Sequence, residues 1–291
     1  MLASLRAWLI AAHAFPLMAV MVLTALIALV SADGEPDASR LVALLVAMLA
    51  SQLAIGWSND YLDREVDALH QPWKPIVRGD IDAAKMPFAI FCALVVSLAA
   101  GVTLGWLPLL LLVVGTSAGL VYNLWLKASR FSALPYLVAL GVLPPFVWTA
   151  LDVYEDDFLG LYLVATPLAL AAHLANVLPD VESDRDQGRQ TLAVALGVAR
   201  SLLVLAVCLL APLPLLAIAQ VALDDAGEAA GFYDESVLIP VLVAYVALVA
   251  VAGALYAGDL RRPSRAMLVR AFRLVVAAGV LFAVGWLAAV A

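Results

Sequence analysis

Two short acidic segments interrupt an otherwise apolar chain, and the first of them carries four carboxylates. It runs from Asn59 to Asp67 and reads NDYLDREVD. In a helix, Asn59, Asp63 and Asp67 are spaced i, i+4 and i+8, which places three oxygen-bearing side chains on one face. Such side chains repel one another unless a cation lies between them, and hard divalent cations prefer oxygen ligands. The first segment therefore predicts a divalent-cation site.

The second acidic segment repeats this spacing at Asn176, Asp180 and Asp184. Duplicated halves that meet at a site are common in membrane proteins. Protein-bound Mg²⁺ is usually held by one or two carboxylates together with substrate phosphates. The two segments thus predict a cavity in which Mg²⁺ ions hold a diphosphate between them, with nearby Lys and Arg side chains on the remaining oxygens. The simpler alternative is a set of solvated carboxylates paired with Arg64, Arg185 and Arg189.

The composition shows what kind of protein must position these segments. The 291 residues are 65% hydrophobic and 13% charged, with a mean hydropathy of +1.03. Soluble domains are about half apolar and about a quarter charged. The chain is therefore predicted to be an integral membrane protein, which excludes a soluble nucleic-acid binder or a cytosolic enzyme. Its two cysteines, Cys92 and Cys208, lie in apolar runs and predict neither a disulfide nor a thiolate metal site.

Nine segments are apolar enough to span a bilayer, which requires about 20 residues. We predict an all-α membrane protein: one domain over residues 1–291 with nine transmembrane helices around a central cavity. The acidic segments 59–67 and 176–184 follow the second and sixth helices as a pseudo-repeat. The predicted helices are Trp8–Val30, Leu41–Trp57, Met86–Leu104, Leu107–Leu124, Ala133–Leu151, Leu159–Leu178, Leu202–Leu223, Val237–Ala257 and Leu268–Val290.

The charges divide cleanly between the two sides of these nine segments. Fifteen of the 16 basic residues fall at the N-terminus, after even-numbered segments or at the start of the ninth: Arg6, Arg64, Lys74, Arg78, Lys85, Lys127, Arg130, Arg185, Arg189, Arg200, Arg261, Arg262, Arg265, Arg270 and Arg273. Only Arg40 lies on the other side, where the loops are acidic, including Glu228. Cytoplasmic loops carry an excess of Lys and Arg. We therefore predict a plasma-membrane protein with the N-terminus and both acidic segments cytoplasmic and the C-terminus outside.

The residues in and around the acidic segments resemble the UbiA superfamily of intramembrane prenyltransferases. The resemblance covers most of the chain. It rests on Asn59-Asp60-x-x-Asp63-x-x-x-Asp67 and on Asp180-x-x-x-Asp184, on their flanks Lys74-Pro75-Ile76, Gly79 and Gly188-x-x-Thr191-Leu192, and on the Tyr122 to Lys127 stretch.

This resemblance implies Mg²⁺-dependent transfer of a polyprenyl group from a polyprenyl diphosphate to a membrane-accessible small molecule, through an allylic carbocation. Its implied partners are these substrates and membrane lipid, without nucleic acid. It assigns one Mg²⁺–diphosphate cluster to Asn59, Asp63 and Asp67 and the other to Asp180 and Asp184. It further implies phosphate contacts from Lys74 and Arg78 in a cytoplasmic cap, catalytic roles for Tyr122 and Lys127 in contacting the diphosphate or positioning the acceptor, and secondary roles for Asp60 and Glu182. The repeated spacing makes Asn176 a candidate substrate contact.

The acceptor stays open at this point. We favour an aromatic, quinone-type acceptor, with a glycerol-phosphate lipid precursor or a terpene-cyclase reaction of the same superfamily as alternatives. An ion-coupled secondary transporter is a different class, and it would place its carboxylates near the membrane midplane. His173 is a candidate for acceptor binding or for support of Asn176, against a plain helix–helix hydrogen bond. His13 likewise stands between a functional and a structural role.

Overall fold

The computed structural model describes residues 2–226, 234–257 and 264–291. These residues form helices and no strand, and nine of the helical spans among them are long and apolar enough to cross a membrane. The predicted fold class and helix count are therefore confirmed for the described part of the chain, which is a multi-pass integral membrane protein. Arg261, Arg262 and Glu228, which entered the charge pattern, lie outside the described residues.

Internal contacts divide the chain into two compact units. The first contains residues 1–125 and 142–153, and the second contains residues 126–141 and 154–291. Each unit carries one of the two acidic segments, Asn59–Asp67 in the first and Asn176–Asp184 in the second. The single domain around a central cavity and its cytoplasmic cap stay predictions.

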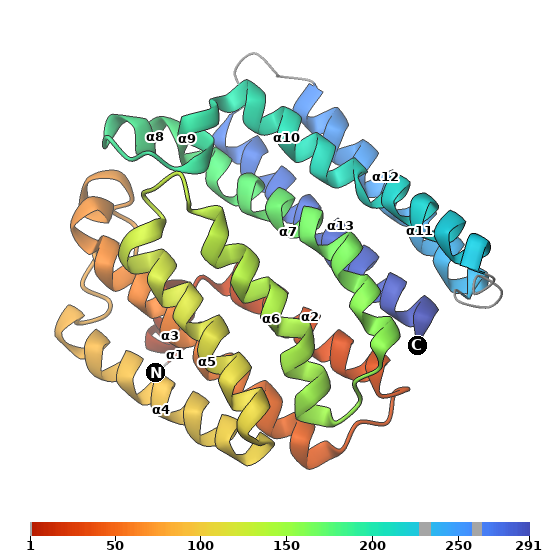
Figure 1. The fold of residues 1–291 in the computed structure, drawn as a ribbon. Coiled ribbons are helices and arrows are strands. Elements are labelled where there is room, and N and C mark those ends of the chain that lie inside the picture. The colour runs from red at the N-terminus through yellow and green to blue at the C-terminus, as the bar shows by residue number, and fades with distance from the viewer. Residues whose placement is uncertain (1, 227–233, 258–263) are drawn as a thin grey trace. The chain divides into compact units, whose positions relative to one another are not determined.

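In the first unit, α3 is the central element. It packs along α4 over most of its length and also contacts α2 and α5 (Figure 1). The elements of this unit are α1 (Leu2–Ala11), α2 (Ala14–Ser31), α3 (Ala38–His70), η1 (Ala83–Lys85), α4 (Met86–Leu104), α5 (Trp106–Val121), most of η2 (Tyr122–Leu126) and the C-terminal part of α6 (Ala133–Leu151). Arg40, the exception in the charge pattern, donates to the Ala150 carbonyl at 2.7 Å near the end of α6. A cation at a helix C-terminus is favourable.

The predicted first helix, Trp8–Val30, is wrong as a continuous element. α1 ends at Ala11 and α2 begins at Ala14, with His13 between them in the left-handed conformation, φ 55° and ψ 64°. This break lies against α3, where Gly56 faces it: a Cβ at Gly56 would lie 2.6 Å from the Ala12 carbonyl oxygen. A hydropathy pattern does not register such a break, because both sides of it are equally apolar.

The predicted second helix, Leu41–Trp57, is too short at its C-terminal end. α3 continues to His70 and has 33 residues, so it is about 50 Å long, against about 30 Å of bilayer hydrocarbon. Asp37 caps its start by accepting from the Arg40 backbone N–H at 2.9 Å. The first acidic segment is thus the last third of this helix, rather than a loop after it, and the predicted helical spacing is confirmed.

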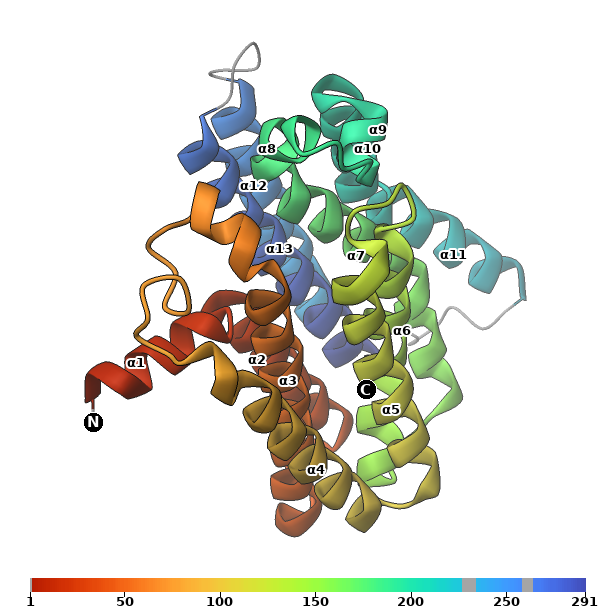
Figure 2. The same ribbon diagram turned by 90° about the vertical axis from the view of Figure 1, so that its left-hand side faces the viewer.

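In the second unit, α7 and α13 run side by side, α12 packs on α13, and α10 and α11 pack on α7 (Figures 1 and 2). The predicted seventh helix, Leu202–Leu223, is two helices that meet at Ala211, because Pro212 has no backbone N–H to continue the first. The elements here are the N-terminal part of α6, η3 (Asp156–Gly160), α7 (Leu161–Val177), η4 (Leu178–Asp180), α8 (Val181–Asp186), α9 (Leu192–Leu196), α10 (Val198–Leu210), α11 (Pro212–Ala226), α12 (Glu235–Ala257) and α13 (Arg265–Val290).

Candidate active site

The acidic face of α3 already holds a cation, the ammonium group of Lys74. Its Nζ lies 2.8 Å from Asp60 Oδ1 and 2.8 Å from Asp67 Oδ2, two helical turns apart on the same face. Asp60 and Asp67 are only 2% and 4% exposed. Burial alone would lower the pKa of Lys74, but the two carboxylates outweigh burial and raise the pKa above its usual value. These carboxylates therefore converge on a point that favours positive charge.

Asp60 and Asn59 have a second partner, the imidazole of His13. The Nε2 atom of His13 lies 2.8 Å from Asp60 Oδ1 and 3.1 Å from Asn59 Nδ2. The buried Asp60 carboxylate thus links His13 to Lys74. Asp63, between these residues, is half-buried.

A π-helical turn joins the end of α5 to the acidic helix. This turn, η2, begins at Tyr122, and its Asn123 donates to the Ile55 carbonyl and to the Ser58 hydroxyl, both at 2.8 Å. Asn123 thereby fastens the Tyr122 turn to α3 directly before Asn59. The sequence pattern did not single out Asn123, although a polar residue within an apolar helix end was a signal for it. π-Turns inside helices are frequent at functional sites.

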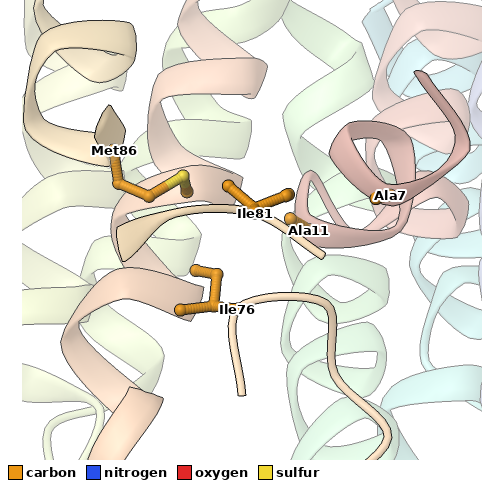
Figure 3. Packing of buried hydrophobic residues seen from close by; sticks show 5 residues of the cluster. All are labelled: Ala7, Ala11, Ile76, Ile81 and Met86. Carbon is orange, nitrogen blue, oxygen red and sulfur yellow. The ribbon is translucent and has the colours of Figure 1, made fainter. Parts of the chain in front are cut away.

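The loop that carries Lys74 is held by α1. Ile76, Ile81 and Met86 form a buried cluster with Ala7 and Ala11 of α1 (Figure 3). This packing places Lys74 on the acidic face. Arg78 of the same loop is exposed instead and pairs with Asp80 at 3.3 Å. Of the two basic residues predicted from this loop, the structure therefore brings only Lys74 to the acidic residues.

In the second unit, the acidic segment is less regular. Asn176 lies in α7, Asp180 in the 3₁₀ turn η4 and Asp184 in α8. Pro179 lies in that turn and interrupts the helix, as its position predicts. Arg265, the first residue of α13, contacts Asp180 Oδ1 through Nη2 at 3.0 Å and Nε at 3.2 Å. Arg189 contacts Asp184 Oδ1 at 3.3 Å. Arg265 entered the charge pattern of the sequence only as one of the basic loop residues.

His173 supports the segment that follows Lys127. It is fully buried, and its Nε2 lies 3.1 Å from the Ser132 hydroxyl, which also accepts from the Leu192 backbone N–H at 3.3 Å. A further backbone bond joins Gln190 to Ala128 at 3.0 Å. The structure thus shows a hydrogen bond from His173 to another chain segment, and a role of His173 in acceptor binding stays a prediction. Lys127 belongs to this second unit, whereas Tyr122 belongs to the first.

The donor types on the first face fit a hard divalent cation. The side chains on this face would coordinate a metal ion through oxygen atoms only, which suits Mg²⁺; they are Asn59, Asp60, Asp63 and Asp67. Within residues 2–226, 234–257 and 264–291, no group of three or more His, Cys, Asp or Glu side chains is arranged to hold a metal ion. On the first face, the Lys74 ammonium lies between Asp60 and Asp67.

A family model described as the UbiA prenyltransferase family matches residues 18–275 of this chain. The chain belongs to this family. The predicted superfamily is thereby confirmed. The matched UbiA region contains both acidic segments, the η2 turn and Lys74, while His13 and the whole of α1 precede it.

Similar UbiA proteins include two archaeal enzymes named digeranylgeranylglyceryl phosphate synthase. The enzyme of Korarchaeum cryptofilum is 28% identical over 194 residues, which are 63% of this chain and 66% of that protein. The enzyme of Methanothermobacter thermautotrophicus is 30% identical over 188 residues, 63% of this chain and 65% of that protein. The matches thus span slightly less than two thirds of either relative.

Solved UbiA structures share the fold. A UbiA homologue from Archaeoglobus fulgidus bound to GPP and Mg²⁺ has a TM-score of 0.68 at 18% identity, with 95% of this chain and 98% of that chain covered. An apo UbiA homologue from Aeropyrum pernix K1 has a TM-score of 0.66 at 16% identity, with coverages of 92% and 96%. At these identities the likeness concerns the fold, and it extends over nearly the whole chain.

Proposed function

We propose that this UbiA family member transfers a prenyl group from a prenyl diphosphate to an acceptor within the membrane, with Mg²⁺ as its cofactor. The observation that carries the proposal is the Lys74 ammonium, 2.8 Å from each of two buried carboxylates on one helix face. Carboxylates that stabilise a buried cation in this way are suited to a metal–diphosphate complex. The Mg²⁺-bound, GPP-bound relative of the same fold supports the choice of cofactor and substrate class.

In this proposal Asn59, Asp63 and Asp67 bind Mg²⁺ through their oxygen atoms, and Asp180 and Asp184 do the same in the second unit. When bound, Mg²⁺ neutralises the diphosphate as it becomes a leaving group. Lys74 leaves its carboxylates and donates to phosphate oxygens, and Arg265 and Arg189 are placed to do the same from Asp180 and Asp184. Tyr122 and Lys127 contact the diphosphate or the acceptor, and Asn176 contacts substrate as the counterpart of Asn59.

The proposed reaction breaks the bond between the allylic carbon and the diphosphate oxygen, and the diphosphate keeps the electron pair. The allylic cation that remains is attacked by a nucleophilic atom of the acceptor, which forms the new bond and then loses its proton. Exclusion of water is necessary, because water would otherwise capture the cation. Helices embedded in lipid give the apolar prenyl chain a water-free environment throughout this step.

For the acceptor, the relatives favour a glycerol-phosphate lipid precursor over the aromatic, quinone-type acceptor that the sequence analysis preferred. The two archaeal relatives are both named as synthases of digeranylgeranylglyceryl phosphate. We therefore propose geranylgeranyl transfer to a glycerol phosphate that already bears one geranylgeranyl chain.

The transporter class is disfavoured by the position of the first acidic segment. Ion-coupled transporters bind their ions near the bilayer midplane. Asn59–Asp67 occupies the end of a helix of 33 residues, after about 20 apolar residues that suffice to cross the hydrocarbon core.

The deciding experiment uses the purified full-length protein in lipid nanodiscs. Geranylgeranyl diphosphate and Mg²⁺ are added with either the geranylgeranylated glycerol phosphate or an aromatic acid acceptor, and products are identified by mass spectrometry. We expect the ether product and released diphosphate with the glycerol phosphate, and neither of them with EDTA present. Diphosphate release without any acceptor, accompanied by a cyclic hydrocarbon product, would indicate the cyclase reaction, and no release under any condition would overturn the proposal.

Variants of the acidic residues test the assigned roles. Asp63→Ala and Asp180→Ala are each expected to reduce turnover by about 10³-fold or more, comparable to the loss of a main electrostatic contribution to catalysis. Glu65→Ala is the matched control in the first segment, because the Glu65 side chain is 85% exposed. Asp186→Ala, also exposed, serves the second segment. Turnover retained by Asp63→Ala or Asp180→Ala would remove that residue from the proposed metal site.

A further inference from the structure

The His13 backbone has a conformation that its surroundings must impose. Its φ of 55° is positive, although His has a Cβ, and it forms the break between α1 and α2. Residues other than glycine seldom adopt this conformation, and they persist in it where neighbouring structure requires it. The break turns the chain between α1 and α2, and from this turn the His13 side chain reaches α3.

The His13 side chain reaches two consecutive residues of the acidic segment. Nε2 lies 2.8 Å from Asp60 Oδ1 and 3.1 Å from Asn59 Nδ2. A protonated Nε2 donates to Asp60, and an unprotonated Nε2 accepts from Asn59, so the ring binds one of the two side chains in either tautomer. When the Asn59 amide nitrogen is held by His13, its oxygen is left for a cation.

Three further contacts fix the place from which His13 acts. Trp57 Nε1 donates to the Trp8 carbonyl at 3.1 Å, and the two indole rings pack edge to face with centroids 5.1 Å apart. The Ala12 carbonyl lies so close to Gly56 that no side chain fits between them. The apolar cluster of α1 with the Lys74 loop, against which Trp8 and Trp57 also pack, further holds α1 (Figure 3). His13 is therefore held by a frame built onto α3 itself.

We propose that His13 is a positioning residue for the reaction. According to its tautomer it orients Asp60, and through Asp60 Lys74, or it orients Asn59, so that side chains of the acidic face are held ready for Mg²⁺ and the diphosphate. This inference rests on the proposed function. Partners that orient metal-binding side chains typically contribute about 10- to 100-fold to metal affinity.

His13→Gly is the sharpest test, because glycine adopts a positive φ without strain and the substitution removes only the ring. The matched control is His70→Gly, which removes an exposed histidine at the C-terminal end of α3. Mn²⁺ binding is measured by electron paramagnetic resonance in the presence of a non-reactive geranylgeranyl thiolodiphosphate. The midpoint of thermal unfolding in detergent is measured in parallel, as are the KM and kcat of turnover.

For His13→Gly we expect Mn²⁺ affinity to fall about 10- to 100-fold and KM for the prenyl diphosphate to rise, with an unchanged thermal midpoint. Wild-type affinity in His13→Gly would overturn the inference, as would a loss of affinity that is matched by a lower thermal midpoint. If the wild-type protein itself binds neither Mn²⁺ nor the diphosphate analogue, the proposed function fails as well.

A second variant keeps the inference testable if His13→Gly does not fold. Asp60→Asn weakens the same contact from the α3 side, and we expect it to lower Mn²⁺ affinity by a similar factor. In the double variant the two losses should be less than multiplicative, because both substitutions break the His13–Asp60 contact, while Asp60→Asn also weakens the Asp60–Lys74 ion pair. Fully multiplicative losses, or wild-type affinity in Asp60→Asn, would overturn the role assigned to His13.

Discussion

At the scale of single residues, the first acidic face is organised by Lys74. Its side chain is 12% exposed, and its ammonium group lies between two carboxylates that are nearly inaccessible to water. A buried charge destabilises the folded state unless an opposite charge is paired with it. Removing one partner of a buried pair is therefore strongly destabilising, because the other charge is left uncompensated. We therefore expect Lys74 to keep the acidic face intact when no metal ion is bound, and in the proposed function Mg²⁺ takes over that role.

Lys74→Met tests this role. The two carboxylates lose their counter-ion, so we expect the free energy of unfolding to fall by about 3 kcal/mol without Mg²⁺. Millimolar Mg²⁺ should recover most of this loss, because the metal supplies the missing positive charge. Thermal unfolding in detergent, with and without Mg²⁺, measures both effects. Lys85→Met, an exposed lysine in the same connection, should change stability little; an equal loss there would contradict the proposal.

The pH dependence of the same pair follows from the direction of the pKa shift. The carboxylates raise the pKa of Lys74 above its usual value of 10.5. A group with a raised folded-state pKa contributes its full stabilisation below the unfolded-state pKa and loses it as the pH rises through the folded-state pKa. The stability difference between wild type and Lys74→Met should therefore be constant between about pH 7 and pH 9 and shrink only above the usual lysine pKa. Urea unfolding at several pH values checks this; a difference that already fades below pH 9 would contradict it.

At the scale of elements, two interruptions of helices position the chemistry. The left-handed backbone of His13, between α1 and α2, brings the His13 side chain to α3. The 3₁₀ turn at Pro179 separates Asn176 from Asp184. Close helix packing supports the first of these. Gly56 makes it possible, because the Ala12 backbone occupies the space that any side chain at position 56 would need.

Gly56→Ala is expected to destabilise the protein by about 1–3 kcal/mol, as overpacking of a close contact typically does. The atom in the way is a backbone carbonyl, which cannot retreat as a flexible side chain would, so α1 must move. Gly253→Ala is the control, because no atom lies within 4 Å of a Cβ at that position of α12. Thermal unfolding of both variants measures the difference, and a Gly56→Ala protein as stable as wild type would show that α1 is not held against α3 in this way.

At the scale of the whole molecule, the described residues contain nine candidate membrane spans, and each compact unit carries one acidic segment. The charge pattern predicts which ends of these spans are cytoplasmic. The loop between α3 and α4 belongs to the predicted cytoplasmic side, and the loop between α6 and α7 belongs to the opposite side.

Cysteine labelling in intact cells tests this orientation. In a background without Cys92 and Cys208, Asp82→Cys and Asp157→Cys each introduce one exposed cysteine, in the two loops respectively. A membrane-impermeant maleimide should label Asp157→Cys from outside and Asp82→Cys only after the cells are opened. Labelling of both from outside, or the reverse pattern, would contradict the predicted sidedness.

The sequence by itself determined the membrane class, the number of spans, the helical spacing of Asn59, Asp63 and Asp67, and the UbiA family. These features depend on local composition and on residue spacing, which the order of residues specifies directly. The tertiary structure alone decided that Lys74 rather than Arg78 meets the acidic face, that Arg265 pairs with Asp180, and that His13 and Asn123 bond the acidic helix. These contacts join residues that are distant in sequence or lie in irregular loops, where packing rather than periodicity sets the direction of each side chain.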